Sequence, residues 1–264
     1  EQANALTDES SPAYLPGFFQ LALGSVLDSP RITEAAKSGE GIGWHDHVDH
    51  VHEGCERFFR PSYNAHLLTE WLPALDGAVE KLEQGAVVAD VGCGHGASTI
   101  LMAEAFPASR FHGFDYYEAS IATAEERAKA AGVGDRAVFS LAPAASYSGD
   151  GYDLVTMFDC LHDMGDPAGA ARHVRASLAP GGSWMIVEPR AGDRVEENLN
   201  PVGRAYYGFS TFLCTPSSLS QEVGLALGAQ AGEARIREIV LGAGFSSFRR
   251  IAETPFNMVF EARP

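Results

Sequence analysis

A carboxylate followed by three glycines at alternate positions is the part of the sequence best suited to bind a ligand. Residues 87–96 read VVADVGCGHG, and the acid and the glycines are Asp90, Gly92, Gly94 and Gly96. The β-branched run predicts a buried strand, and glycine permits a positive φ and a close approach of the backbone to a ligand. A helix predicted over 97–105 would direct its unpaired N–H groups at this loop. A carboxylate there would repel a pyrophosphate and could attract an ammonium group, directly or through water.

A second acid follows about twenty residues later, at the end of a second predicted strand over 110–115. In such a strand–helix unit, the acid at the tip of the second strand accepts hydrogen bonds from ribose hydroxyls. Asp115 is therefore the candidate for binding ribose, and Tyr116 can stack beside an adenine. The ribose of NAD could bind the same acid, so Asp115 alone does not identify which adenosine-containing cofactor binds.

The glycine-rich segment resembles motif I of class I S-adenosylmethionine-dependent methyltransferases. The LAPGG segment at 178–182 is also similar to that family, and the resemblance covers residues from about 80 to 264. It implies S-adenosyl-L-methionine as cofactor and S-adenosyl-L-homocysteine as product. The residues expected to hold the cofactor are Asp90, Gly92, Cys93, Gly94, Gly96, Asp115, Tyr116, Pro143, Ala144, Phe158 and Asp159.

One segment departs from the family pattern. Members often carry an acid after the third strand that binds the adenine amino group, whereas residues 141–145 here read LAPAA. We therefore expect adenine to rest on backbone groups and apolar side chains around Pro143 and Ala144.

The segment after the fourth predicted strand carries the candidate base. Residues 158–167 read FDCLHDMGDP and resemble the Leu-His-Asp-Trp stretch of small-molecule O-methyltransferases, in which the histidine is the general base; Met164 replaces the tryptophan. A hydroxyl acceptor must lose its proton, and imidazole titrates near neutrality, so we expect His162 to be the catalytic base. The alternative is that His162 only bonds a backbone carbonyl and shapes the pocket. Asp163 is not assigned to orienting His162, because neighbours on a helix do not face each other.

The alternation of strands and helices predicts an α/β fold. We expect a Rossmann-like, seven-stranded methyltransferase sheet with helices on both faces, a final antiparallel hairpin and a helical N-terminal segment before it. Later strands are expected at 137–141, 152–158, 183–187, 247–252 and 257–261, helices at 119–131, 168–178 and 234–241, and a turn at 179–182.

Two regions are expected. Residues 1–80 show helical patches at 18–27, 33–37, 48–59 and 63–72 and are expected to form a cap on the substrate side. Residues 81–264 are expected to bind the cofactor, with a lid insertion at about 189–219 that contains Tyr206 and Tyr207. The resemblance is closest to bacterial members that carry a leading winged-helix domain and are sometimes described as transcriptional regulators. It leaves open that such a domain preceded Glu1.

Four histidines and two acids crowd the stretch WHDHVDHVH at 44–52. A helix starting near Asp46 would put His47 and His50 on one face and turn His52 away. Three interpretations remain open: a metal site, a polar wall of the substrate pocket that includes His45 and His47, and a solvated helix start. The expected site contains no metal.

Composition narrows the range of partners. There are 35 Asp and Glu residues against 19 Lys and Arg, a formal charge of −16, and this charge repels nucleic acid. The signature of base-directed amino methylation is also missing after the fourth strand. Four dispersed cysteines indicate reduced thiols in the cytoplasm, and no apolar run is long enough to cross a membrane. A homodimer is compatible with the sequence.

These observations favour methyl transfer to a small-molecule acceptor, with oxygen favoured over nitrogen or carbon. The first alternative is a regulatory protein that binds S-adenosylmethionine and whose DNA-binding domain is absent from this chain. A second alternative is a NAD-linked oxidoreductase.

Overall fold

The computed structural model describes residues 2–9 and 11–264, which divide into two compact units. Unit 1 is formed by the described residues of Glu1–His66, by His162–Pro167 and by Pro189–Ala234. Unit 2 is formed by Leu67–Leu161, Ala168–Glu188 and Arg235–Pro264. All residues expected to bind the cofactor lie in unit 2, and all candidates on the acceptor side lie in unit 1.

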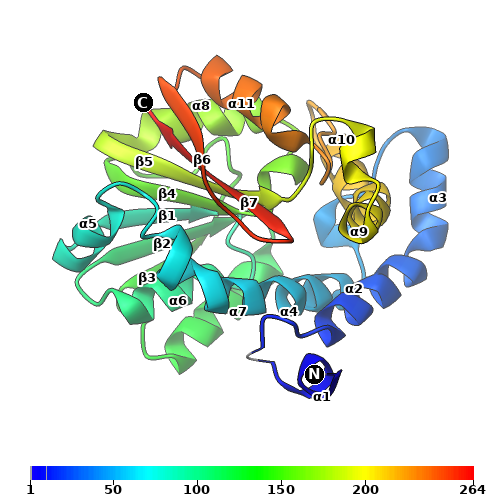
Figure 1. Cartoon of the computed structure of the whole chain (residues 1–264), viewed down its shortest axis with the longest axis horizontal. Coiled ribbons are helices and arrows are strands. Elements are labelled where there is room, and N and C mark those ends of the chain that lie inside the picture. Colours follow the sequence, from blue (N-terminus) through cyan, green and yellow to red (C-terminus); the bar gives the residue numbers. More distant parts are fainter. Residues whose placement is uncertain (1, 10) are drawn as a thin grey trace. The chain divides into compact units, whose positions relative to one another are not determined.

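Unit 2 is built on a seven-stranded sheet with the order β3-β2-β1-β4-β5-β7-β6 (Figure 1). The pairs β1–β2, β1–β4, β2–β3 and β4–β5 are parallel, whereas β6 and β7 are antiparallel. The strands are β1 (Val87–Val91), β2 (Arg110–Asp115), β3 (Ala137–Leu141), β4 (Tyr152–Phe158), β5 (Leu178–Pro189), β6 (Ser247–Glu253) and β7 (Asn257–Arg263). The predicted fold class, including the final antiparallel hairpin, is confirmed.

Helices cover both faces of this sheet. Figure 1 shows α8 and α11 on one side and α6 and α7 on the other. Their bounds, with that of α5, are α5 (Ala78–Gln84), α6 (Ala97–Ala105), α7 (Glu118–Ala130), α8 (Pro167–Ser177) and α11 (Gly232–Gly242). Because the central strands are covered on both faces, β1 and β4 are almost continuously apolar and buried.

The turn expected at 179–182 is wrong, because these residues belong to β5. Tyr152 pairs with Leu178 and Leu154 pairs with Ser183, so four residues of β5 lie opposite one residue of β4. This bulge accommodates the glycines without ending the strand, and Gly181 takes a positive φ of 77° there.

Unit 1 is helical. Its elements are α1 (Gln2–Thr7), α2 (Pro16–Leu27), α3 (Ser29–Ser38), η1 (Trp44–Asp46), α4 (Asp49–His66), η3 (Leu161–Asp163), η4 (Val195–Asn198), α9 (Pro201–Phe209), η5 (Ser210–Cys214) and α10 (Thr215–Leu219); η3 begins in unit 2. The two helices expected at 48–59 and 63–72 are instead one helix, α4, followed by a π-helical turn, η2 (Leu67–Trp71). Pro61 lies buried inside α4, where packing outweighs the local preference of proline for a helix end.

Glycines allow α2 and α4 to approach to backbone contact. A Cβ added at Gly24 of α2 would lie 2.8 Å from the backbone nitrogen of Val51, and one at Gly54 of α4 would meet the backbone of Leu21. The two helices therefore pack without intervening side chains at these points.

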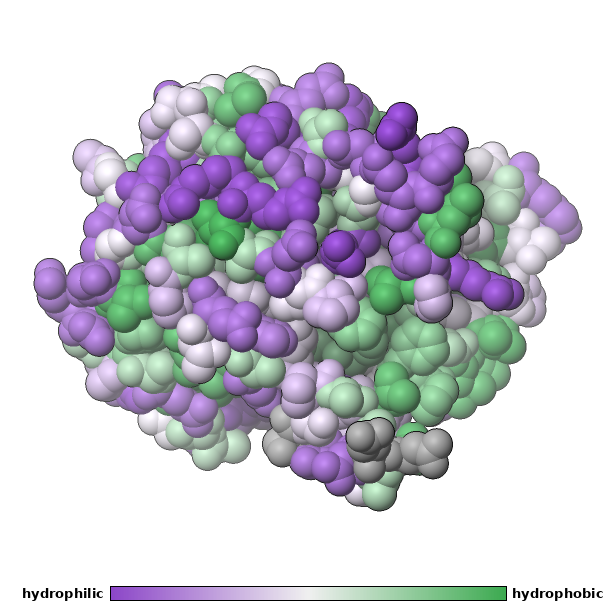
Figure 2. Space-filling view, in the orientation of Figure 1, coloured by the Kyte–Doolittle hydropathy of each residue, from purple (hydrophilic) through white to green (hydrophobic). Residues whose placement is uncertain are grey.

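The outer face of α2 carries a row of exposed apolar side chains. Phe19, Leu23, Val26 and Leu27 recur at helical spacing and are between 49% and 64% exposed. Figure 2 shows hydrophobic residues gathered over this helix. Contiguous exposed apolar surface is typical of an interaction surface. The homodimer stays a prediction.

Within the described residues, no helix combines the length and the apolar character needed to cross a membrane. All four cysteines are free of disulfides.

The packing of α2 on α4 predicts that Gly24→Ala destabilises the protein. The added methyl group has no space, and overpacking of this kind costs about 1–3 kcal/mol, which corresponds to a fall in Tm of about 2–10 °C. The matched control is Gly208→Ala in α9, where a Cβ would meet nothing within 4 Å. That variant should keep or slightly raise Tm, because alanine favours a helix over glycine. Equal melting curves for the two variants would contradict the close packing of α2 on α4 at Gly24.

Candidate functional site

The glycine-rich loop after β1 keeps an open side. Gly92, Gly94 and Gly96 all have positive φ, at 74°, 51° and 78°. A Cβ at Gly92 would lie 2.6 Å from Sγ of Cys160, and one at Gly96 would lie 3.0 Å from the ring of Phe139. A Cβ at Gly94 would meet nothing within 4 Å. Two of the glycines are therefore required by packing, and the third leaves the backbone open to a ligand.

Asp90 is buried beneath this loop and accepts three hydroxyl hydrogen bonds. Ser98 and Thr99 donate to Oδ2 at 2.7 and 2.6 Å, and Thr156 donates to Oδ1 at 2.9 Å. Burial raises the pKa of Asp90, and the hydroxyls oppose that shift because they stabilise the charged form. A carboxylate has about four acceptor positions, so one remains for an ammonium group or a water molecule. The three hydroxyl residues were not predicted from the sequence.

Asp115 fixes the loop from the end of β2. Its Oδ2 accepts from the backbone N–H of Gly94 at 3.0 Å, and its Oδ1 accepts from that of Tyr117 at 2.9 Å. Burial raises the pKa of Asp115, and these two hydrogen bonds oppose the rise because they stabilise the charged form. The other residues predicted to bind the cofactor differ in burial. Cys93 and Phe158 are buried, Ala144 is half-buried, and Tyr116 and Pro143 are exposed.

Asp159, at the end of β4, is held in an unusual conformation. Its φ is 51°, which a residue other than glycine adopts rarely and mostly near functional sites. Nδ2 of Asn257, the first residue of β7, donates to Oδ1 of Asp159 at 2.7 Å. Asn257 could not be predicted, because the pair is 98 residues apart and meets only through the sheet.

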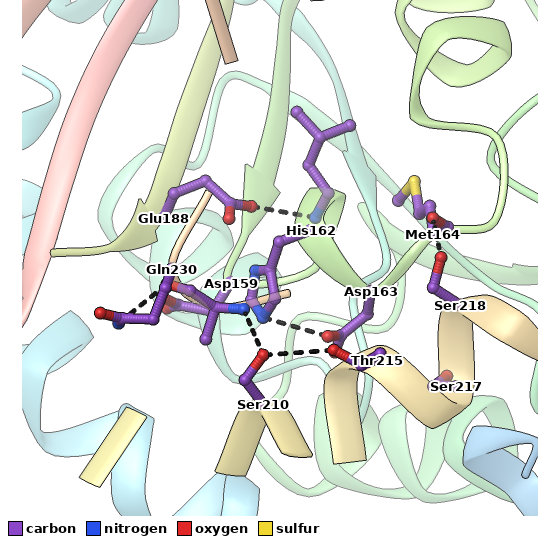
Figure 3. Close-up of polar contacts among 12 residues, drawn as sticks. Asp159, His162, Asp163, Met164, Glu188, Ser210, Thr215, Ser217, Ser218 and Gln230 are labelled. Atoms are coloured by element: carbon purple, nitrogen blue, oxygen red, sulfur yellow. Dashed lines mark hydrogen bonds and ion pairs between the residues drawn. The ribbon is translucent and has the colours of Figure 1, made fainter. Parts of the chain in front are cut away.

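His162 and Asp163 lie together in unit 1, immediately after β4 along the chain. Nε2 of His162 is 3.0 Å from Oδ1 of Asp163 (Figure 3). The expectation that these neighbours do not face each other was wrong, because a short 3₁₀ turn rather than an α-helix sets their directions. Cys214 lies beside both side chains; burial raises the pKa of its thiol to about 12, and the charge of Asp163 adds to that rise.

The backbone of this segment is held by later residues of the same unit. Ser218 donates to the carbonyl of Met164 at 2.8 Å, as Figure 3 shows. Nε2 of Gln221 donates to the carbonyl of Asp163 at 3.1 Å, and the N–H of Gly228 donates to that of His162 at 3.3 Å. The turn is therefore fixed independently of its side chains.

The other candidates on the acceptor side differ in burial. Tyr206 is buried in an apolar cluster with Leu21 and Val51, whereas Tyr207 and His45 are exposed at the surface. His47 is buried, and its Nδ1 lies 2.8 Å from Oδ2 of Asp28. Their role in a substrate pocket stays a prediction.

The histidines at 44–52 do not gather around one point in the described part of the chain. His47 pairs with Asp28, and Nε2 of His52 bonds the carbonyl of Trp44 at 2.8 Å. The group of potential metal ligands that the described residues do bring together is His162, Asp163 and Cys214.

Residues 89–184 match the sequence family described as "Methyltransferase domain". The match runs from β1 into β5 and includes the glycine-rich loop and Asp115. Residues 89–184 therefore belong to a methyltransferase domain. Its cofactor is S-adenosylmethionine, and the sequence prediction of that cofactor is confirmed.

Named relatives agree with this assignment. The chain is 34% identical over 126 residues to trans-aconitate 2-methyltransferase of Variovorax paradoxus, a match that covers 47% of this chain and 45% of the relative. It is 32% identical over 131 residues to 27-O-demethylrifamycin SV methyltransferase of Amycolatopsis mediterranei, covering 47% and 48%. The matches span about half or less of the length of these curated relatives.

The fold is shared with human N-acetylserotonin methyltransferase, whose structure was solved in complex with S-adenosylmethionine. The TM-score is 0.61 at 15% identity, and the match covers 89% of this chain and 65% of the human chain. The open side of Gly94 and the remaining acceptor position on Asp90 fit a cofactor that carries an ammonium group. The assignment of individual cofactor-binding residues stays a prediction.

The open side of the loop predicts that Gly94→Ala weakens S-adenosylhomocysteine binding. The methyl group would occupy space that the cofactor needs, and we expect Kd to rise about tenfold or more, measured by isothermal titration. The matched control is Gly132→Ala, which has a φ of 71° and equally open surroundings after α7. In both variants, the strain of a non-glycine residue at positive φ should lower the free energy of unfolding by about 1–2 kcal/mol. Unchanged affinity in Gly94→Ala would place the cofactor elsewhere.

The buried Asp28–His47 pair predicts a pH-dependent stability. Burial lowers the pKa of His47 below its ordinary value of 6.5, and this outweighs the opposing effect of the hydrogen bond that His47 donates to Asp28. The unfolded chain then binds the proton first, so Tm should fall as the pH drops below about 6.5. His47→Gln, which can still donate to Asp28 but does not titrate, should reduce the difference in Tm between about pH 7.5 and 5.5.

The control is His50→Gln, an exposed histidine of the same stretch, which should keep the wild-type difference. If His47→Gln keeps the full wild-type difference as well, the titration of His47 does not contribute to it.

Proposed function

We propose that the protein transfers the methyl group of S-adenosylmethionine to a hydroxyl group of a small-molecule acceptor, with His162 as general base. The observation that carries the proposal is the contact of 3.0 Å between Nε2 of His162 and Asp163, directly after the methyltransferase strand β4. The methyltransferase domain supplies the activity class, and this pair supplies a reason for an oxygen acceptor.

The cofactor supplies an electrophilic methyl group bound to a sulfonium. A hydroxyl group becomes a strong nucleophile when its proton is removed as it attacks. A neutral imidazole carries one proton and one lone pair. In the tautomer that carries its proton on Nε2, next to the Asp163 carboxylate, the lone pair is on Nδ1, and Nδ1 of His162 accepts the hydroxyl proton.

Asp163 has a defined part in that step. When Nδ1 takes the proton, the imidazole becomes a cation, and the carboxylate 3.0 Å from Nε2 stabilises that charge. An acceptor nitrogen that already has a free lone pair would need no such base. The pair therefore favours oxygen over nitrogen.

The acceptor class follows from the charge and from unit 1. A formal charge of −16 disfavours polyanionic acceptors. Aromatic side chains of α9, with Tyr206 and Tyr207 among them, suit a flat and largely apolar molecule. The two relatives are named for small-molecule substrates, which supports a small acceptor.

Replacing the base should stop turnover without affecting cofactor binding. We expect His162→Ala to lower kcat for a hydroxyl acceptor by about 10²–10⁴-fold, the usual contribution of a general base. The measurement uses S-adenosylmethionine with a labelled methyl group and a panel of phenolic and alcoholic acceptors. Titration with S-adenosylhomocysteine should show Kd within about twofold of wild type, a difference well below 1 kcal/mol.

The control is His50→Ala, which removes an exposed histidine of the same unit and should leave kcat unchanged. Wild-type turnover in His162→Ala would end the assignment of the base. Methylation of amines alone, with no hydroxyl acceptor accepted, would contradict the proposed acceptor class.

A further inference from the structure

Three side chains with different donor atoms meet in unit 1, and the proposed methyl transfer uses only two of them. A ring nitrogen of His162, a carboxylate oxygen of Asp163 and Sγ of Cys214 all lie within 4.8 Å of one another. His162 and Cys214 are buried, and the Asp163 side chain is 24% exposed. Oδ1 of Asp163 is itself buried and receives no hydrogen bond of good geometry from the described residues.

We propose that His162, Asp163 and Cys214 form a binding site for a zinc-class transition metal ion, and that an ion bound there inhibits methyl transfer. The inhibitory part rests on the proposed function, whereas the site itself does not. It departs from the sequence expectation that the site holds no metal.

The donor set selects the ion. Imidazole nitrogen, carboxylate oxygen and thiolate sulfur are the three ligand types of zinc sites, whereas magnesium and calcium prefer oxygen alone. Zinc bonds of about 2.0–2.3 Å in a tetrahedron place ligand atoms about 3.3–3.7 Å apart. The three donor atoms need to move by about 1.5 Å or less to reach that spacing.

The backbone already holds the three ligands together. Cys214 is the last residue of the π-helical turn η5, and α10 begins with the next residue. Ser218 of α10 donates to the carbonyl of Met164, the residue after Asp163 (Figure 3). One helix therefore fixes both the cysteine and the His–Asp turn. π-Helical turns frequently mark functional positions, because they redirect side chains that a regular helix would orient elsewhere.

Three protein ligands leave one coordination position open, as zinc sites that bind water or substrate do. The exposed part of Asp163 provides a route by which an ion can enter. On binding, the thiol proton leaves to solvent and the thiolate bonds the metal. The imidazole bonds through Nε2 and carries its single proton on Nδ1.

This arrangement excludes base catalysis. A neutral imidazole has one lone pair, and an ion on Nε2 uses it. Nδ1 then bears a proton and cannot accept one from a hydroxyl acceptor. Metal binding and methyl transfer therefore compete for His162.

The test is titration of the full chain with Co²⁺, a spectroscopic substitute for Zn²⁺. We expect one ion per chain and a thiolate-to-cobalt charge-transfer band in the near ultraviolet. Cys214→Ser should abolish the band. The matched control is Cys55→Ser, which removes another cysteine of unit 1 that forms no disulfide and should keep the band.

A second variant covers the case in which Cys214→Ser fails to fold. Asp163→Asn keeps the shape of the side chain, and it should keep the band while weakening Zn²⁺ binding at least about tenfold in competition with a chelator. Wild-type protein without the band, or a band that survives in folded Cys214→Ser, would overturn the site.

The inhibitory part has its own readout. Zn²⁺ should abolish methyl transfer by wild type, and a chelator should restore it. Full turnover by protein that is shown to hold Zn²⁺ at this site would overturn the proposed inhibition, and the metal site itself would still stand. Absence of turnover with every acceptor before metal is added would count against the proposed function, and the cobalt band would still decide the site.

Discussion

The arrangement of the predicted cofactor-binding loop depends on the hydrogen bonds that the buried carboxylate of Asp90 accepts. It accepts hydroxyl hydrogen bonds from two residues at the start of α6 and from one on β4. A desolvated charge is costly unless such donors satisfy it, so the strand, the helix and the neighbouring strand are held in one arrangement. The glycine-rich loop connects two of these elements. The hydrogen bonds of Asp90 therefore hold both ends of the loop, and the loop keeps its shape without a side chain at Gly94.

The same logic extends along the edge of the sheet. Asp115 accepts the backbone N–H of Gly94 and so joins the loop to the end of β2. Asn257 joins β7 to Asp159 at the end of β4, where Asp159 has a positive φ. Polar groups that could bind a ligand are thus fixed by hydrogen bonds within unit 2. Preorganisation of this kind is what positions reacting groups for catalysis.

Much of unit 2 could be predicted because its signals are local. The limits of β2, β3, β4 and α6 follow from apolar runs bounded by charged residues, glycines and prolines, and the structure agrees with them. The buried partners of Asp90 could not be predicted, since a hydroxyl at a helix start or in a strand has many uses. Asn257 and Cys214 are far along the chain from the residues that they join, and only the fold brings them there.

Local signals also failed where packing outweighed them. Two helices were expected at 48–59 and 63–72, yet α4 continues through Pro61 and buries that residue. The glycines after Leu178 suggested a turn, yet the ladder with β4 continues beyond them as a bulge. Asp163 was expected to face away from His162, and a three-residue 3₁₀ turn brings the two side chains within 3.0 Å. In each case the surrounding contacts decided the local conformation.

The central claim is that unit 2 binds S-adenosylmethionine for methyl transfer. The most direct test is isothermal titration of the wild-type chain with S-adenosylmethionine, S-adenosylhomocysteine and NAD in parallel. We expect micromolar binding of both adenosyl ligands, with one site per chain, and no binding of NAD. A protein shown to be folded that binds neither adenosyl ligand, or that binds NAD instead, would contradict it.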